Sequence, residues 1–423
     1  MRTSRPAASR VFLRSRRAAA SLLCGALLSA AGTPARSAAQ SPDDFTRCLT
    51  TLRGSRLARS ITATTWEQHV TRLRPDSAVL VSLNAQPEFR LAIWDYFAIM
   101  VDDERIADGQ RMLSEQSQTL SRIGERSSVD AATIVAIWGV ESNFGTGQGG
   151  LPIVRSLATL SCLGRRQAYF RRELMAALRI LQADHVEPAR FTGSWAGAFG
   201  HTQFMPSTFE WAAVDFDGDG KRDVVDNAGD ALASTANFLV RAGRWRAGVP
   251  WGFEVQVPSD ARIVREGRAH RRSLAAWSAA GLTRVDGTPL ANGLLSSRAR
   301  AALLRPAGPH GPAFIALDNF FAVLRYNAST SYALAIVHLA DRLRGGAALV
   351  TAWPTNDLGL SRTDRRELHG LLAARGHHVG APTAVLTPLV VAAIRTEQTR
   401  LNVAVSGRPG QRLLAALRAP NKE

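Results

Sequence analysis

One glutamate in this 423-residue chain stands out because it closes an apolar helical pattern. Residues 130–145 read Asp-Ala-Ala-Thr-Ile-Val-Ala-Ile-Trp-Gly-Val-Glu-Ser-Asn-Phe-Gly. Four of them recur at the i, i+3, i+4 and i+7 spacing of one helix face: Ile134, Ile137, Trp138 and Glu141. Burial among such side chains penalises a charged carboxylate, so we expect a raised pKa for Glu141, as a general acid requires. The alternative is a buried glutamate paired with one of the many arginines.

An acidic segment further along has the spacing of a metal-binding loop. Residues 215–226 read Asp-Phe-Asp-Gly-Asp-Gly-Lys-Arg-Asp-Val-Val-Asp and fit the twelve-position EF-hand pattern, with glycine at the sharp turn. The expected oxygen ligands are Asp215, Asp217, Asp219, Lys221 through its backbone carbonyl, Asp223 and Asp226. Asp226 stands where glutamate is usual, so magnesium is an alternative to calcium, and a metal-free solvated turn is another. We expect a structural calcium ion that braces the wall of the active site.

The region that must position these residues reads as mainly helical. Asp130 is a good N-cap and Gly145 can end a helix in a left-handed conformation, which predicts a helix over 130–143. Further helices are expected over 92–102, 103–123, 166–183, 206–213, 228–243 and 331–342. Residues 245–312 are richer in glycine, proline and tryptophan, with short apolar runs such as 253–257. They predict a small inserted α/β subdomain.

The N-terminus carries the features of an export signal. Residues 1–17 are arginine-rich, an apolar run covers 18–31, and small residues precede Gln40. This order is typical of a secretory signal peptide over residues 1–39, with a retained anchor as the alternative. We therefore expect an exported, periplasmic protein that is associated with the membrane or the cell wall.

Charge and cysteine content fit an exported protein that acts on an anionic polymer. Residues 1–39 hold seven arginines and no acidic residue, so without them the formal charge falls from +17 to about +10. No zinc-ligand spacing or other nucleic-acid motif accompanies this charge, so we expect no nucleic-acid partner. Cys48 and Cys162 then remain as a candidate disulfide, with two separate buried thiols as the alternative.

Several separated blocks resemble one known family. Residues 141–145, Glu-Ser-Asn-Phe-Gly, resemble the catalytic Glu-Ser motif of lysozyme-like lytic transglycosylases. Residues 86–89 with 94–96, 165–171, 193–207 and 325–332 resemble, in order, further motifs of the B-type membrane-bound lytic murein transglycosylase family. The matches extend through most of residues 45–344. The resemblance implies a mainly α, lysozyme-like catalytic domain over residues 40–345, a single calcium loop and no organic cofactor.

The same resemblance assigns roles to individual residues. Glu141 would be the single acid/base catalyst. The residues that would bind the acetamido groups or position Glu141 are Ser194, Gln203, Tyr326 and Asn327. The sugar groove would be lined by Tyr96, Phe204 and Met205, for which core packing is the alternative. Arg165 and Arg166 would meet carboxylates of the peptide stems. Phe199 and His201 depart from the family motif, which predicts altered saccharide contacts.

The last part of the chain reads as a separate small domain. Residues 346–358 form a linker, and residues 359–423 contain three short helical patterns, the first capped by Thr363 or Asp364. This part resembles the three-helix peptidoglycan-binding domain found on many cell-wall hydrolases, with a generic helical appendage as the alternative. Ala384, Thr387 and Glu397 depart from the pattern of that domain, so the resemblance predicts the fold and leaves the glycan affinity open.

These observations predict a peptidoglycan lytic transglycosylase. A hydrolase of this kind usually needs two carboxylates, and the matched active-site blocks (141–145, 165–171, 193–207 and 325–332) hold no acid besides Glu141. One acid suffices if the C6 hydroxyl of N-acetylmuramic acid attacks its own C1, which forms a 1,6-anhydro ring after cleavage of the β-1,4 bond to N-acetylglucosamine. The alternatives are a muramidase-type hydrolase and a non-catalytic cell-wall scaffold. The expected partners are peptidoglycan glycan strands and other cell-wall enzymes, and a monomer is expected.

Overall fold

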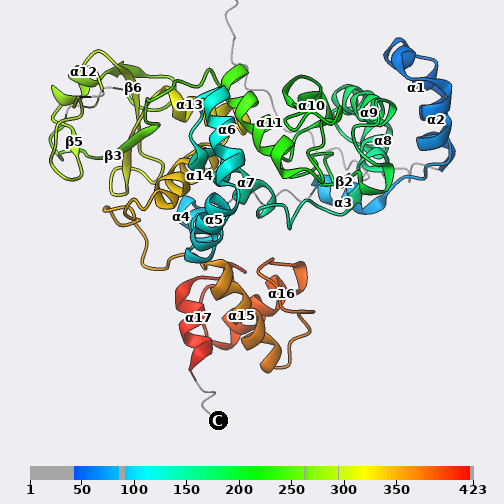
Figure 1. Cartoon of the computed structure of the whole chain (residues 1–423). Coiled ribbons are helices and arrows are strands. Elements are labelled where there is room, and N and C mark those ends of the chain that lie inside the picture. Colours follow the sequence, from blue (N-terminus) through cyan, green and yellow to red (C-terminus); the bar gives the residue numbers. More distant parts are fainter. Residues whose placement is uncertain (1–41, 85–90, 262, 264, 294, 420–423) are drawn as a thin grey trace, which may run out of the picture. The chain divides into compact units, whose positions relative to one another are not determined.

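The computed structural model describes residues 42–84, 91–261, 263, 265–293 and 295–419. The expected signal peptide and the motif at residues 86–89 lie outside these residues. Helices dominate the described part, with small sheets, which confirms the mainly α prediction (Figure 1). None of the described helices is both long and apolar enough to cross a membrane.

The first apolar core joins the N-terminal helices to two long helices. The elements around it are α1 (Pro42–Arg53), η1 (Arg56–Ser60), α2 (Ala63–His69), α3 (Ser77–Asn84), α8 (Ile153–Leu163), α9 (Gln167–Gln182) and α10 (Pro206–Ala212). A disulfide links Cys48 in α1 to Cys162 in α8, as expected. Helix α8 precedes α9 directly and packs along it, although no helix was expected over residues 153–163.

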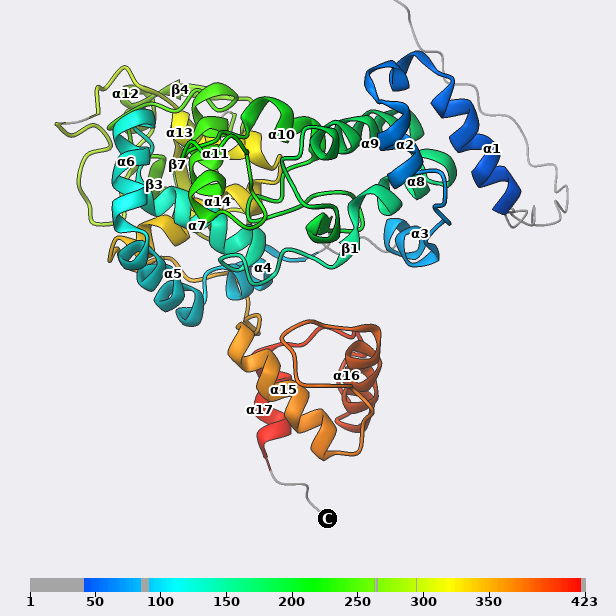
Figure 2. The same cartoon turned by 45° about the vertical axis from the view of Figure 1, so that its right-hand side comes forward.

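The second core surrounds the helix that carries Glu141. It is built from α4 (Ile93–Met100), α5 (Asp103–Glu115), α6 (Ser117–Ser127), α7 (Ala131–Ser142), α11 (Ala228–Arg241), α13 (Asp318–Tyr326) and α14 (Thr330–Leu343). Helix α7 packs against α14, α5 and α11, and Figures 1 and 2 both show it among these helices. The expected helix over 103–123 is instead two helices, because Gln116 ends α5 and begins α6.

Helix α7 differs from the predicted amphipathic helix. Residues 132–139 are all buried, so its apolar side chains surround the helix and do not form a stripe. Asp130 is the N-cap, as expected, and accepts a hydrogen bond from the Thr133 N–H at 3.0 Å. The left-handed conformation begins earlier than expected, at Asn143 (φ 47°), and continues through Gly145. The helix therefore ends at Ser142, one residue after Glu141.

The inserted subdomain is a five-stranded antiparallel sheet. Its strands are β3 (Gly252–Gln256), β4 (Arg271–Ser273), β5 (Thr283–Arg284), β6 (Arg300–Leu304) and β7 (Ala313–Ala316), in the order β4-β6-β7-β3-β5. Trp277 in α12 (Leu274–Ser278) is fully buried against this sheet. The last strand, β7, lies wholly beyond the expected boundary at residue 312. A separate two-stranded pair joins β1 (Leu151–Pro152) to β2 (Thr192–Gly193).

The C-terminal module, residues 359–419, has the three expected helices. They are α15 (Arg362–Ala374), α16 (Pro388–Arg400) and α17 (Gln411–Arg418), and they enclose an apolar core of their own. The cap of α15 is Ser361, not Thr363 or Asp364: its hydroxyl accepts from the Asp364 N–H while the Asp364 carboxylate accepts from the Ser361 N–H. Glu397, one of the departures from the family pattern, is buried and accepts hydrogen bonds from His377 and Arg400.

Candidate functional site

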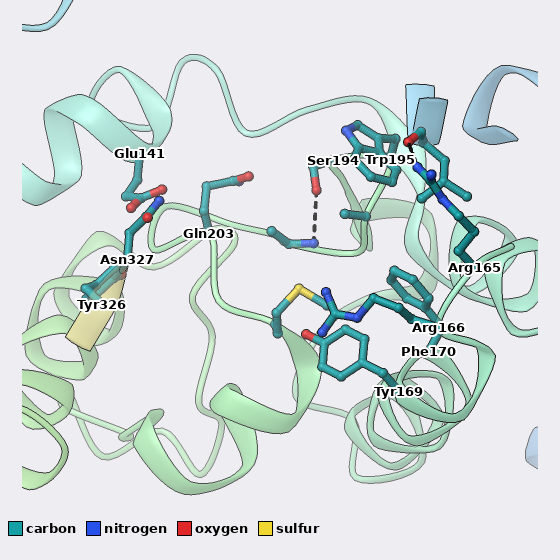
Figure 3. Close-up of a pocket in the computed structure, with 14 residues that line it drawn as sticks. Glu141, Arg165, Arg166, Tyr169, Phe170, Ser194, Trp195, Gln203, Tyr326 and Asn327 are labelled. Atoms are coloured by element: carbon teal, nitrogen blue, oxygen red, sulfur yellow. Dashed lines mark hydrogen bonds between the residues drawn. The ribbon is translucent and has the colours of Figure 1, made fainter. Parts of the chain in front are cut away.

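A groove with a volume of about 660 Å³ runs past the end of α7. Its walls come from α7, the start of α9, the end of α13 and the segment that precedes α10 (Figure 3). Besides Glu141, the predicted site residues that line it are Arg165, Arg166, Ser194, Gln203, Met205, Tyr326 and Asn327. Residues far apart in the sequence therefore meet in one cavity. Among the described residues that line this groove, Glu141 is the only one with a carboxylate.

Glu141 lies in the last turn of α7, half-buried at one end of the groove. The Tyr332 hydroxyl donates a hydrogen bond to its Oε1 atom at 2.5 Å. Tyr332 is itself buried in the first turn of α14, where Ser329 caps the helix. Burial, together with the neighbouring Glu141 carboxylate, raises the pKa of Tyr332 well above its ordinary value. The phenol therefore stays protonated and acts as a neutral donor to the acid.

Tyr326 and Asn327 form the wall beside Glu141 (Figure 3). The Tyr326 hydroxyl donates to the Thr202 carbonyl at 2.6 Å, which ties the end of α13 to the glycine-rich segment 193–207. Burial raises the pKa of Tyr326 well above its ordinary value, and the Glu141 carboxylate adds to the effect. The Asn327 Oδ1 atom accepts from the Ser329 N–H at 3.1 Å, which fixes the side chain at the start of α14.

The glycine-rich segment 193–207 supplies the floor of the groove. The Ser194 hydroxyl accepts from the Ala198 N–H at 3.1 Å, drawn as the dashed line in Figure 3. Gln203 has a left-handed backbone, and its Nε2 atom donates to the carbonyls of Gln148 and Gly200 at 2.9 Å each. Gly200 has a φ of +70°, and a side chain there would meet the Val224 carbonyl oxygen at 2.4 Å. The segment thus packs directly on the acidic loop at Val224.

Phe199 and His201, the departures from the family motif, lie under the groove and do not line it. Phe199 is fully buried between Phe191 and Phe209. His201 accepts from the indole N–H of Trp138 at 2.8 Å, and its backbone carbonyl accepts from the Ser142 hydroxyl at 2.8 Å. Burial lowers the pKa of His201, which favours this neutral acceptor. Phe199 therefore packs in the first core, and His201 holds the end of α7 through Trp138 and Ser142.

Two further assignments to the groove are corrected by the structure. Phe204 is buried between Phe238 and Tyr326, with ring centroids 5.8 and 5.6 Å away, so it belongs to the core. Tyr96 packs against the second core and is not among the described residues that line the groove. Both sit in family motifs, but aromatic residues there serve packing as readily as sugar contact.

The far end of the groove is cationic and aromatic. The Arg165 Nη2 atom donates to the Leu83 carbonyl at 2.8 Å, and the Arg166 guanidinium lies 4.6 Å from the centre of the Tyr169 ring. Tyr169 and Trp195 line the groove although neither was assigned a role from the sequence (Figure 3). Both lie within the motif blocks 165–171 and 193–207, which was the available signal. Tyr332, in the block 325–332, was missed in the same way.

The acidic loop gathers three of its expected ligands. One carboxylate oxygen from each of Asp215, Asp217 and Asp219 lies within 4.8 Å of the other two. Gly218 and Gly220 both have positive φ and let the loop turn tightly. Backbone N–H groups of the loop donate to these carboxylates; for example, those of Gly218 and Gly220 both donate to Asp215. The oxygen-rich donor set fits a hard cation such as calcium.

The remaining expected ligands are engaged elsewhere. The Asp226 carboxylate pairs with the Arg190 guanidinium at 2.5 Å. Asp223 accepts from the N–H groups of Val225 and Asp226. Lys221 pairs through its side chain with Asp184, which leaves its backbone carbonyl as the predicted ligand. The buried Asp230 side chain anchors the loop: it accepts hydrogen bonds from the N–H groups of Phe216 and Asp223 at 2.8 Å each.

A groove lined by one half-buried glutamate, on a lysozyme-like helical fold, fits the class of glycan-cleaving enzymes. Residues 44–341 match the Transglycosylase SLT domain family, and the chain belongs to it, as a lytic transglycosylase of the B type. The chain is 33% identical over 274 residues to membrane-bound lytic murein transglycosylase B of Escherichia coli (strain K12); the aligned part covers 64% of this chain and 73% of that protein.

Solved structures of lytic transglycosylases are also similar to this chain. SltB3 from Pseudomonas aeruginosa, in complex with NAG-anhNAM-pentapeptide, is 44% identical, with a TM-score of 0.71 over 89% of this chain and 99% of that chain. The lytic transglycosylase Slt35 of Escherichia coli, in complex with calcium, is 28% identical, with a TM-score of 0.60 over 71% of this chain and 92% of that chain. This chain is similar to both proteins in fold and in sequence.

Proposed function

We propose that this enzyme cleaves the β-1,4 bond between N-acetylmuramic acid and N-acetylglucosamine in peptidoglycan, and that Glu141 serves first as general acid and then as general base. The observation that carries this proposal is the position of Glu141 as the one carboxylate that lines the groove in the described part of the chain. SltB3 binds a muropeptide with an anhydro end, which supports the same substrate class here.

The reaction balances without an external nucleophile. Protonated Glu141 gives its proton to the glycosidic oxygen, and the bond from that oxygen to C1 of N-acetylmuramic acid breaks. The acetamido group of the substrate stabilises the positive charge at C1. Glu141, now a carboxylate, takes the proton from the C6 hydroxyl, whose oxygen bonds to C1 and closes the 1,6-anhydro ring. The acid is thereby restored for the next cycle.

The other residues of the groove bind and orient the sugars in this proposal. The acetamido groups are met by Ser194, Gln203, Tyr326 and Asn327. Since Gln203 uses its Nε2 atom for two backbone carbonyls, it is the Oε1 atom that would accept from an acetamido N–H. Tyr332 holds the Glu141 carboxylate, and Met205 lines the sugar path. Arg165 and Arg166, at the far end, meet the carboxylates of the peptide stems.

We further propose that the acidic loop binds a structural calcium ion through Asp215, Asp217 and Asp219 and the Lys221 carbonyl. Slt35 was solved with calcium, and the three carboxylates already converge in this chain. For Asp226 to complete the set, its carboxylate would have to leave Arg190. The loop contacts the groove floor through Val224, whose carbonyl accepts from the His201 N–H at 2.8 Å. The ion would therefore stiffen the wall beside Glu141.

The remaining assignments concern location and the C-terminal module. We propose that the protein is exported to the periplasm after loss of residues 1–39, in keeping with its relationship to a membrane-bound murein transglycosylase. The catalytic domain would extend over residues 40–345. The C-terminal module would assist binding to the cell wall, as its resemblance to peptidoglycan-binding domains suggests.

The decisive experiment combines one substitution with product analysis. Glu141→Gln should lower the rate of muropeptide release by at least about 10²–10⁴-fold, because the amide keeps the shape but cannot exchange the proton. Glu187→Gln, which changes an exposed glutamate outside the groove, should leave the rate unchanged. Mass spectrometry of digested sacculi should find 1,6-anhydro ends, which are lighter by one water than hydrolysis products. Reducing ends would indicate a muramidase, and no release by the wild-type protein would indicate a scaffold.

A further inference from the structure

The first residue of helix α15, Arg362, connects the C-terminal module to the catalytic domain. Its guanidinium and backbone make three hydrogen bonds to the Asp102 carboxylate: the backbone N–H donates at 3.1 Å, Nε at 2.8 Å and Nη2 at 2.9 Å. The two side chains are only 9% and 4% exposed. Such a buried, two-pronged pair is rigid because both partners are desolvated and satisfied by one another.

The remaining guanidinium nitrogen of Arg362 reaches the helix that carries Glu141. The Nη1 atom donates to Asn143 Oδ1 at 2.6 Å. Asn143 lies two residues after Glu141 and ends α7 in the left-handed conformation, where its N–H donates to the Gly139 carbonyl. One arginine of the module therefore binds at once the start of α5, through Asp102, and the end of α7.

Asn143 is a sensitive point because the end of α7 and the groove floor are joined there. Its Nδ2 atom donates to the Thr146 hydroxyl, which starts the segment that leads to Gln148. The Gln148 carbonyl accepts from Gln203 at 2.9 Å. On the opposite side, Ser142 is held by His201. The last turn of α7 is thus fixed from the catalytic domain through Ser142 and from the module through Asn143.

A second arginine docks the module without contact to α7. Arg408 binds Asp95 in α4 with Nε at 2.7 Å and Nη2 at 2.6 Å, and Asp357 with Nη1 at 2.7 Å. An exposed contact, from Arg366 to Glu104, adds to the same interface. Docking of the module and contact with the catalytic helix can therefore be altered separately.

We propose that Arg362 is a positioning residue for the catalytic acid: through Asn143 it sets the last turn of α7, and with it the direction of Glu141 toward the bond that is cleaved. The inference rests on the proposed role of Glu141. It makes the module part of the catalytic apparatus as well as a wall-binding appendage. Loss of this contact would lower the rate of the chemical step even on short soluble glycans, which gain nothing from tethering.

The test is a double-mutant cycle between Arg362 and Asn143. Arg362→Lys keeps a positive charge for Asp102, but one amine cannot bind Asp102 and Asn143 with the same fork. Asn143→Gly keeps the left-handed backbone and removes the acceptor. With a soluble tetrasaccharide that carries no stem peptides, each variant should lower kcat by about three- to tenfold with KM unchanged, since misplacement of a catalytic group acts on the chemical step.

The pattern across the cycle decides the question. If Arg362 acts through Asn143, the double variant should be no slower than the slower single variant. Arg366→Gln, which removes the exposed contact to Glu104, should leave kcat at the wild-type value and serves as the docking control. An unchanged kcat for Asn143→Gly, or effects of the two substitutions that multiply, would overturn the inference. If Arg362→Lys does not fold, the kcat of Asn143→Gly decides alone. Activity retained by Glu141→Gln would instead refute the proposed function.

Discussion

Two buried or half-buried carboxylates lie on either side of the end of helix α7, and they have different partners. Glu141 accepts a hydrogen bond from the neutral Tyr332 phenol, whereas Asp102 is enclosed by the Arg362 guanidinium. Burial alone would raise the pKa of Asp102, but the bonds from Arg362 and from the Arg105 N–H lower it below its ordinary value overall. A phenol can remain hydrogen-bonded to either form of an acid, but a guanidinium fits only the carboxylate. A carboxylate that exchanges a proton, as proposed for Glu141, therefore needs a different hydrogen-bond donor from one that holds two parts of the chain together, as Asp102 does.

Asp102→Asn tests the contact between Asp102 and Arg362, and it should lower the free energy of unfolding more than any other substitution considered below. The substitution leaves the Arg362 charge buried without its counter-charge, and breaking a buried pair in this way costs about 3–5 kcal/mol. Urea unfolding should therefore show a fall of this size in the free energy of unfolding. Glu104→Gln breaks the half-exposed pair to Arg366 and should cost less than about 1 kcal/mol.

The same pair predicts how acid affects the attachment. The folded-state pKa of Asp102 lies below its unfolded value, so the stabilisation is fully present above the ordinary pKa of an aspartate. It is lost as the pH falls through the lower folded value. Equal stability of the wild type and Asp102→Asn at neutral pH would contradict this account of the interface.

His338 extends the comparison to a buried base that is held neutral. It lies in α14 beside the linker, stacked 5.9 Å from Phe97, and burial lowers its pKa to about 4. The unfolded chain binds the proton near pH 6.5, so stability should fall as the pH drops from 6.5 to 4. The loss is at most about 1.4 kcal/mol per pH unit, or about 3 kcal/mol in all.

His338→Gln should remove most of that dependence on pH. Urea unfolding at pH 7 and pH 5 measures the difference directly. His378→Gln, at an exposed position of the C-terminal module, should leave the slope as in the wild type. A slope that persists in His338→Gln would show that another group carries the proton linkage.

The acidic loop adds carboxylates whose proposed partner is a metal ion. Calcium that binds only the folded protein should raise its stability by about 2.7 kcal/mol when its free concentration is 100 times Kd. Asp217→Asn should abolish most of this gain, because it removes one of the three converging carboxylates. Asp286→Asn changes an exposed aspartate elsewhere and is the matched control. Melting curves with calcium, magnesium and chelator should separate the two cations, and identical curves would argue against a site.

Local sequence carried most of what was predicted correctly. The Asp130 cap, the position of Glu141, the convergence of three aspartates in the acidic loop and the three C-terminal helices each depend on neighbours that are close in the chain. Phe204 and Tyr96 were misassigned because a motif fixes residue type, while packing decides whether a ring faces the core or the groove. The stripe on α7 was wrong for a related reason: helices pack on every side of α7, which no local pattern records.

The missed contacts are those that join distant segments. Tyr332 is 191 residues from Glu141, and Arg362 is 260 residues from Asp102 and 219 from Asn143. Tyr332 lay in a recognised block, so its importance was open to inference, but its contact with the acid was not. Arg362 is one arginine among many and begins an ordinary capped helix. Only the folded chain shows that it reaches the end of α7.

Tyr332→Phe tests the contact between Tyr332 and Glu141, and we expect it to have the smallest effect of the substitutions proposed here. The substitution removes one hydroxyl and keeps the ring in its buried site, so the fold should change little. Without the bond to Oε1, the Glu141 carboxylate is held less firmly, and we expect kcat to fall about tenfold, equivalent to about 1.4 kcal/mol in the barrier, with KM unchanged.

The hydroxyl of Tyr332 also favours the ionised form of the acid that it binds, so its loss should move the pH–activity profile toward higher pH. A merely structural tyrosine would lower the melting temperature and leave that profile in place. Wild-type kcat with an unmoved profile would mean that Glu141 needs no donor from α14. The difference between a neutral and a charged partner would then matter only for Asp102.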